Sequence, residues 1–140
     1  MREAGPKIRR ALVSRFGVDI GNELTNDVIA YAWEHWDSLA TMENPTGYLC
    51  RVGQSAARRY HRWRRVPPLS PIQTGLPAEP EPELARALTR LKPDQRAAVV
   101  LVHGYGWSYA EAAAVLDIPI TTLRNHLTRG LARLRKQLES

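Results

Sequence analysis

Apolar residues recur every three or four positions along most of this chain, which is the spacing of one face of an amphipathic helix. Two such stripes come first: Ile8, Leu12 and Phe16, then Leu24, Val28 and Tyr31. Gly17 is expected to end the first helix, and the second is expected over about residues 21–36. No stretch alternates apolar and polar residues for long enough to indicate a sheet. The pattern therefore predicts an all-α protein.

A third helix is expected after the Asn44-Pro45 pair, because proline fits the first position of a helix and disfavours helix before it. Its apolar face is formed by Leu49, Val52, Ala56, Tyr60 and Trp63. An arginine stands two residues after four of these, at Arg51, Arg58, Arg62 and Arg65. Two residues rotate a helix by about 200 degrees, so the face opposite the apolar one should carry arginine.

Prolines divide the chain into two parts. Six of the ten fall between residues 66 and 83, in a stretch that lacks helical periodicity. We expect a helical domain over residues 5–66, a flexible linker over 67–82 and a second helical domain over 83–140.

In the second part, leucines 84, 88 and 91 predict one helix, and Pro93 opens another that should run to about His103. Ser108 and Glu111 have the spacing of a capping box, which predicts a helix from about Tyr109. After a short break at residues 116–119, a final long helix is marked by Leu123, Leu127, Leu131, Leu134 and Leu138.

Two helices joined by a tight turn, the second long and basic, are typical of a helix-turn-helix that lays its second helix in the major groove of DNA. With the leucines turned inward, small polar and basic side chains share the outward face of the first turns. The candidate DNA-contacting residues are Thr121, Thr122, Arg124, Asn125, Thr128, Arg129 and Arg133. Arginine suits the edge of guanine and asparagine that of adenine, whereas the later arginines are better placed for phosphates.

Charge and composition narrow the function. The 140 residues carry 20 Lys plus Arg against 14 Asp plus Glu, a net charge of +6, which favours a polyanionic partner. Residues 51–65 hold six arginines and no acid, and residues 124–136 hold five basic residues and no acid, so two separate contacts are expected. A single cysteine, Cys50, and four scattered histidines predict neither a disulfide nor a metal site. The sequence contains no catalytic or cofactor-binding motif, so we expect a protein that is not an enzyme and binds no cofactor. It contains no membrane span or signal peptide, so we expect the protein to be cytoplasmic.

Residues 84–138 resemble region four of the extracytoplasmic-function (ECF) sigma factors of bacteria, in the sigma-70 superfamily, through the text LTRLKPDQRAAVVLVHGYGWSYAEAAAVLDIPITTLRNHLTRGLARLRKQL (residues 88–138). That resemblance implies contact with the minus-35 promoter element and with the flap of the RNA polymerase beta subunit. Asp117 departs from it, because the family usually has glycine in this turn. Aspartate tolerates the left-handed conformation better than most residues, so the turn is expected to form.

The first half is similar to region two of the same family, through ELTNDVIAYAWEHWD (residues 23–37) and NPTGYLCRVGQSAARRYHRWRR (residues 44–65). The resemblance implies a polymerase-binding set that faces the clamp helices of the beta-prime subunit: Glu23, Asp27, Trp33 and Trp36. From the residues alone, core packing of the two tryptophans is an equal alternative. The loop from about residue 37 to 44 would hold an unstacked minus-ten base. The residues implied for minus-ten DNA are Asn44, Arg51, Arg58, Arg62 and Arg65.

Family members usually carry one more helix before the one that matches residues 8–16, so the resemblance implies a shortened region two. The expected function is that of a sigma factor, which binds core RNA polymerase and reads minus-35 and minus-10 promoter DNA; an anti-sigma factor is a further partner that the resemblance implies. Two alternatives remain open at this point. One is a helix-turn-helix regulator that lacks polymerase activity, and the other is an interaction protein that occupies polymerase or another sigma factor.

Overall fold

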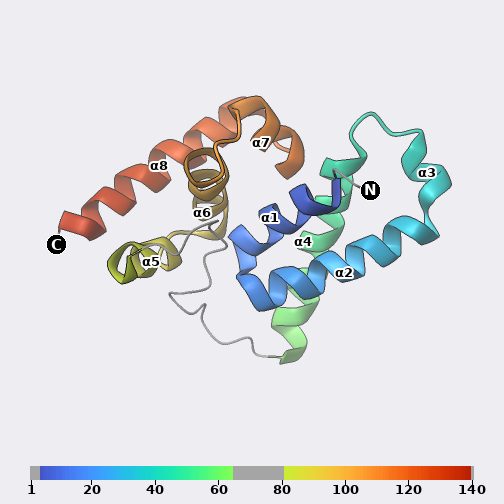
Figure 1. The fold of residues 1–140 in the computed structure, drawn as a ribbon, viewed down its shortest axis with the longest axis horizontal. Coiled ribbons are helices and arrows are strands. Elements are labelled where there is room, and N and C mark those ends of the chain that lie inside the picture. Colours follow the sequence, from blue (N-terminus) through green and yellow to red (C-terminus); the bar gives the residue numbers. More distant parts are fainter. Residues whose placement is uncertain (1–3, 65–80, 140) are drawn as a thin grey trace.

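In the computed structural model, which describes residues 4–64 and 81–139, the described chain consists of helices joined by short turns, as the periodicity predicts. The first half contains four helices: α1 Ala4–Phe16, α2 Val18–Glu34, α3 Trp36–Ala40 and α4 Pro45–Arg64. In Figure 1, α2 leads away from the middle of the molecule to α3, and the chain returns to α4, which crosses α1 and α2.

Glycines set the packing of the first half. Gly17 adopts a φ of 92°, which glycine reaches without strain because it has no side chain. This conformation lets the chain turn from α1 into α2 within one residue. A Cβ at Gly21 would lie 2.5 Å from the Cα of Val13, so the two helices approach at backbone distance. The core between α1, α2 and α4 is built on fully buried Leu12 and Val28, among others.

The loop expected over residues 37–44 is shorter than predicted. The chain leaves helical geometry at His35, whose φ is −118°, and re-enters it at once as α3, so that residues up to Ala40 are helical. His35 Nδ1 lies 3.0 Å from the carbonyl oxygen of Tyr31, which anchors this break. The second helix ends close to the expected position, and no proline or side-chain cap marks the start of α3, so the sequence pattern predicts a loop where this short helix forms.

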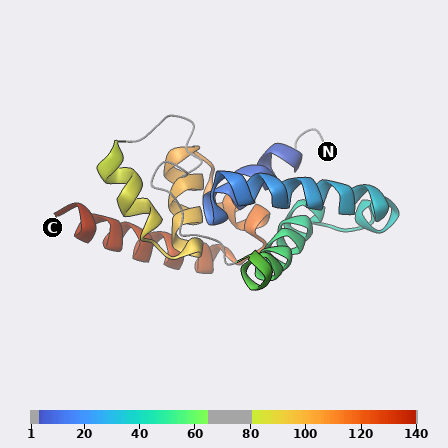
Figure 2. The same ribbon diagram turned by 90° about the horizontal axis from the view of Figure 1, so that it is seen from below.

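The second half contains α5 Pro82–Thr89, α6 Pro93–Val99, a π-helical turn at Val100–Gly104, α7 Tyr109–Leu116 and α8 Ile120–Glu139. The helix expected to reach His103 widens into the π-helical turn after Val99, and Gly106, with a φ of 73°, lets the chain leave it. The long α8 packs against α5, α6 and α7, and Figure 2 shows it running along one side of the molecule.

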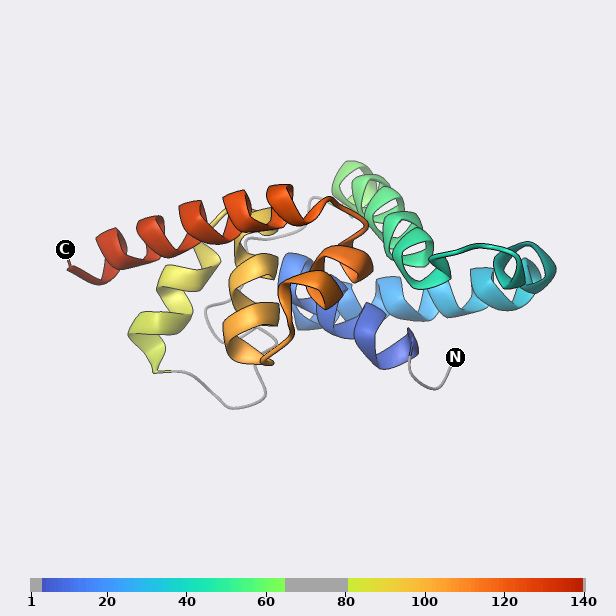
Figure 3. The same ribbon diagram turned by 90° about the horizontal axis from the view of Figure 1, so that it is seen from above.

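The two halves pack against each other. Helix α1 contacts α6 and α7, and the start of α4 contacts α7, as the view from above shows (Figure 3). We call this contact the seam. Most of the expected linker, residues 67–80, lies outside the described residues, and its last residue, Pro82, is the first of α5. In the described part of the chain, no helix combines the length and the apolar character that crossing a membrane requires.

Candidate nucleic-acid interface

The turn between α7 and α8 forms as the sequence predicts. Ser108 Oγ accepts a hydrogen bond from the main-chain nitrogen of Glu111 at 3.0 Å, which caps the start of α7. At the other end, Asp117 is the one non-glycine residue of the described chain with positive φ, at 55° with ψ 50°. The Ile118 nitrogen donates back to the Ala113 carbonyl at 3.0 Å, closing α7 before α8 begins.

Helix α8 separates its faces as expected over its first turns, whereas further along Leu131 and Leu134 are half-buried and Leu138 is 39% exposed, against the expectation of a buried leucine face. Leu123, Leu127 and Gly130 are buried, and a Cβ on Gly130 would lie 3.0 Å from Val99 Cγ2, so this glycine lets α8 lie close on α6. Of the candidate DNA-contacting residues, Thr122 is half-buried, and the others lie on the exposed face: Thr121, Arg124, Asn125, Thr128, Arg129 and Arg133. These exposed side chains are accessible to a partner surface over residues 121–133.

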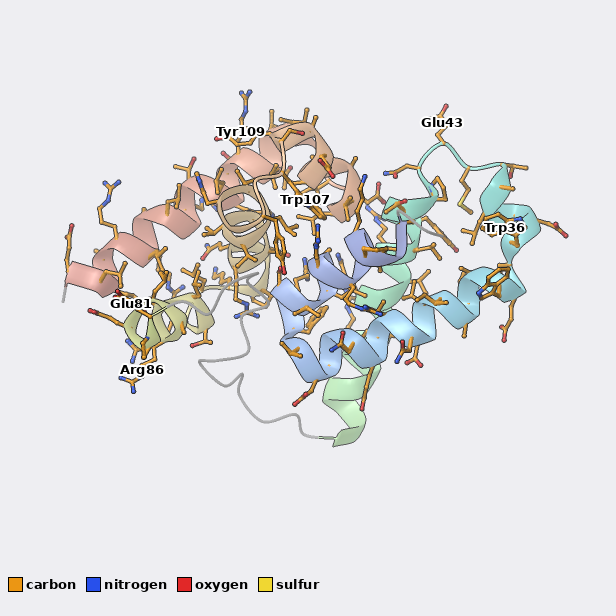
Figure 4. The ribbon with its side chains drawn as sticks, in the orientation of Figure 1. Trp36, Glu43, Glu81, Arg86, Trp107 and Tyr109 are labelled. Carbon is orange, nitrogen blue, oxygen red and sulfur yellow. The ribbon has the colours of Figure 1, made fainter. Side chains whose placement is uncertain are left out.

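Arg124 has an aromatic neighbour that sequence reasoning missed. Its guanidinium carbon lies 5.8 Å from the ring centroid of Tyr109, the first residue of α7, which is 40% exposed. The cation–π contact restrains the arginine near the start of α8. Figure 4 shows Tyr109 where α7 meets α8.

A second basic surface lies on α4. Arg51 and Arg58 are exposed on the face opposite its buried side chains, as predicted. Asn44 caps the helix, since its Oδ1 accepts from the Gly47 nitrogen at 3.1 Å. The Arg62 side chain and Arg65 lie outside the described residues.

An apolar pocket of about 210 Å³ opens beside the loop that joins α3 to α4. The side chains of Trp36, Leu39, Met42 and Leu49 contribute to its lining. It lies next to the segment, at about residues 37–44, that is expected to hold an unstacked base. Flat, apolar groups suit such a lining better than charged ones do.

The tryptophans of the expected polymerase-binding set lie on the surface. Trp33 is 69% exposed and Trp36 is 49% exposed, and their rings stack with centroids 6.2 Å apart. Figure 4 shows Trp36 at the far end of the molecule from α8. Core packing, the alternative from the sequence, is therefore excluded for both. Glu23 and Asp27 also occupy exposed positions, on α2.

Sequence reasoning also missed an aromatic cluster between α2 and α4. The rings of Tyr31 and His35 stack at 4.0 Å, and the hydroxyl groups of Tyr31 and Tyr48 lie 3.2 Å apart. The hydrogen bond with Tyr48 raises the pKa of Tyr31. The four-residue spacing of Tyr31 and His35 was the available signal, because side chains at that spacing are neighbours on a helix.

Two ionisable groups are buried near the seam. Burial, helped by the nearby charge of Arg15, lowers the pKa of Arg96 to about 10. Burial raises the pKa of the Cys50 thiol to about 11, with Asp117 adding to the rise, and Arg15 and Gln54 opposing it. Within residues 4–64 and 81–139, no group of three or more His, Cys, Asp and Glu residues has the arrangement of a metal site.

Comparison with known proteins places this geometry in a family. Residues 82–134, which contain α5 to the greater part of α8, match the family "Sigma-70, region 4". The RNA polymerase sigma-E factor of Streptomyces avermitilis is 32% identical over 126 residues, covering 84% of this chain and 70% of the relative. The ECF RNA polymerase sigma factor EcfG of Rhodopseudomonas palustris is 28% identical over 142 residues, covering 94% of this chain and 78% of the relative.

A solved structure extends the likeness to both halves. The sigma factor RpoE of Bartonella quintana, in complex with the anti-sigma factor NepR, matches with a TM-score of 0.64 and 25% identity. The match covers 97% of this chain and 92% of the solved one. The chain therefore belongs to the RNA polymerase sigma factors of the extracytoplasmic-function type, within the sigma-70 superfamily.

Proposed function

We propose that this chain binds core RNA polymerase and directs it to promoters by reading two DNA elements, one with each half. The observation that carries the proposal is the exposed, basic face of α8, set on a capped helix and an intact turn. An α-helix with this polar face fits the major groove, where arginine and asparagine distinguish bases.

In this proposal α8 reads the minus-35 element. Arg124 and Asn125, near the start of the helix, face base edges, with Thr121, Thr122 and Thr128 beside them. Arg129 and Arg133, further along, neutralise phosphates, and such contacts fix position more than sequence.

The first half meets the minus-ten element. Arg51 and Arg58 on α4 bind the phosphate backbone, with Arg62 and Arg65 continuing the track. The pocket beside the α3–α4 loop takes the face of an unstacked base, since its lining includes Trp36 and Leu39. Opening the duplex in this way uses binding energy and requires no covalent chemistry by this chain.

The stacked, exposed tryptophans support a protein-binding surface at the α2–α3 corner. Large exposed aromatics are the residues that anchor interfaces. Trp33 and Trp36, with the acidic Glu23 and Asp27 on α2, face the beta-prime clamp helices in this proposal, and the second half meets the beta flap. Such a protein works in the cytoplasm, where polymerase and promoters are. An anti-sigma factor is a further proposed partner, because the similar RpoE structure holds one.

Run-off transcription tests this function. The native chain is mixed with core polymerase of the host bacterium and a pool of templates whose upstream region is randomised, and the transcripts are sequenced. Enrichment of two sequence blocks about two helical turns apart is the expected result. Core association without transcripts would leave an interaction protein, whereas DNA selection without core association would leave a regulator. Trp36→Ala is expected to weaken core association while leaving DNA selection by α8 unchanged.

A further inference from the structure

The contact between Tyr109 and Arg124 joins the two helices of the helix-turn-helix. The guanidinium carbon of Arg124 lies over the Tyr109 ring, 5.8 Å from its centroid and within the range of a cation–π interaction. Tyr109 is the first residue of α7, and Arg124 lies one turn after the start of α8. The contact therefore runs from one helix to the other across the turn that joins them.

The position of the tyrosine ring is fixed by the backbone around it. The Ser108 side chain caps α7 directly before Tyr109, and the left-handed conformation of Asp117 sets the turn that leads into α8. Helices α7 and α8 also pack against each other. A side chain carried by packed helices is placed more precisely than one carried by a loop. The ring is therefore a firm support for the arginine beside it.

The ring restrains Arg124 without occupying its hydrogen-bond donors. A guanidinium carries five N–H donors in its plane and can stack on an aromatic ring through its face. A carboxylate partner would instead take up two of these donors. Within residues 4–64 and 81–139, no carboxylate forms an ion pair with Arg124. The arginine is thus held in place while its donors remain available to a ligand.

Such restraint favours discrimination between bases. A bidentate bond to guanine requires the guanidinium to lie along the edge of the base. A side chain that is already held near this orientation loses less freedom on binding. Opposite a wrong base, a freely moving arginine could turn to a phosphate instead, and a restrained one cannot do so as easily. The restraint therefore strengthens binding to the preferred base more than binding to the others.

We propose that Tyr109 is a positioning residue for base recognition, whose ring orients Arg124 and so sets specificity at one base pair of the upstream element. The inference rests on the proposed function, since it needs Arg124 to meet a base edge. Tyr109 acts through the arginine and not through a contact of its own with DNA. Loss of the ring should lower the ratio of affinities for the preferred and a non-preferred base by about two- to five-fold.

Two substitutions separate the ring from the rest of the side chain. Tyr109→Leu removes the ring and keeps a large apolar group, whereas Tyr109→Phe keeps the ring and is the matched control. The probes are two fluorescent duplexes taken from the enriched templates, identical except at the base pair where Arg124→Ala loses its preference. Affinity is measured by anisotropy with core polymerase present. The ratio should fall two- to five-fold in Tyr109→Leu and stay within about two-fold in Tyr109→Phe.

A double-mutant cycle shows whether the effect passes through the arginine. In an Arg124→Ala background, Tyr109→Leu should change the ratio no further. A fall that persists in that background would mean that the ring meets DNA directly. An equal fall in Tyr109→Phe would assign the effect to the hydroxyl group, and an equal loss of affinity for both duplexes would assign it to the backbone or to the turn. Each of these three results would overturn the positioning role.

The restraint itself is measured without DNA, from the NMR order parameter of the Arg124 Nε–H bond in the free full-length chain. Its signal is identified by its absence from the Arg124→Ala protein. The order parameter should fall in Tyr109→Leu and not in Tyr109→Phe. Equal values in the native and Tyr109→Leu proteins, or unchanged base preference in Arg124→Ala, would overturn the positioning role alone. Failure of the native chain to enrich any template with core polymerase would overturn the proposed function and the positioning role with it.

Discussion

Arg96 of α6 donates from Nε to the main-chain carbonyl oxygen of Ser14, 2.7 Å away, across the seam between the two halves. The same guanidinium also donates to the carbonyl oxygens of Arg15 and Thr89. Ser14 and Arg15 lie in the last turn of α1, where helix carbonyls lack partners within the helix. A cation of the second half thus caps a helix of the first, at the end where the helix dipole favours positive charge.

Replacing this cap should destabilise the whole chain. Arg96→Met keeps the length of the side chain and leaves the carbonyls of Ser14, Arg15 and Thr89 without their donor. Buried polar groups that lose a partner cost about 1 to 3 kcal/mol, and relief of the buried charge offsets part of the total. We expect a loss of about 2 kcal/mol in the free energy of unfolding, measured by urea denaturation.

Arg86→Met on α5 is the matched control, because Arg86 is exposed. Exposed substitutions usually change stability by less than about 0.5 kcal/mol. Arg96→Lys should lie between the two, since one ammonium cannot reproduce the spread donors of a guanidinium. Equal stability of the Arg96→Met and Arg86→Met proteins would contradict the capping role.

The Cys50 thiol should make stability depend on pH in the alkaline range. Its pKa is about 11 in the folded chain, against 9.0 for an ordinary thiol, because burial disfavours the thiolate. The raised pKa means that the folded state keeps the proton longer than the unfolded state. Its contribution to stability is therefore complete below pH 9 and is lost as pH rises through 11.

The comparison with Cys50→Ala isolates this contribution. Under reducing conditions, the free energy of unfolding of the native chain should fall relative to that of the variant between pH 9 and pH 11. The difference should approach about 2 kcal/mol at the upper end, from a shift of roughly two pKa units. Parallel pH profiles of the two proteins would show that the thiol titrates normally in the folded chain.

Most helices, and the turn of the second half, could be predicted from the sequence because the residue patterns that specify them are local. Ser108 and Glu111 have the spacing of a cap, Pro93 starts a helix, and Leu123 and Leu127 mark the buried face of α8. These features depend on neighbours within one or two turns, which the sequence displays directly. The position of Asp117 in a left-handed turn was predictable for the same reason.

What the sequence did not reveal depends on contacts between distant residues. Arg51 Nε lies 2.6 Å from a carboxylate oxygen of Asp117, but the two residues are far apart in the chain and nothing local indicates that they meet. Arg96 likewise reads as an ordinary basic residue, and only the fold shows it buried against α1. Helix α3 was missed because no proline or side-chain cap marks its start at Trp36.

Arg124 should determine base preference at one position of the upstream element. Arg124→Ala removes a side chain suited to a bidentate bond with guanine, at a cost of about 1 to 3 kcal/mol against the preferred base. When the template selection is repeated with the variant, one position of the enriched upstream sequence should lose its base preference, and the other positions should keep theirs. Arg129→Ala, further along the same face, should instead weaken all templates about equally. Unchanged preference in Arg124→Ala would remove this residue from the base-reading set.

Arg58 should contact a phosphate of the minus-ten region and not a base. The side chain is exposed on α4, two turns beyond Arg51, and no ion pair across the seam engages it among the described residues. If Arg58 neutralises one phosphate, Arg58→Ala should weaken binding on every sequence and reduce the slope of log affinity against log salt by about 0.9. Arg9→Ala, an exposed arginine of α1 outside the proposed DNA-binding set, should leave that slope unchanged. If the Arg58→Ala variant kept the salt dependence of the native chain, Arg58 would be only a solvated surface residue of α4. The proposed phosphate contacts of this helix would then have to come from its other arginines.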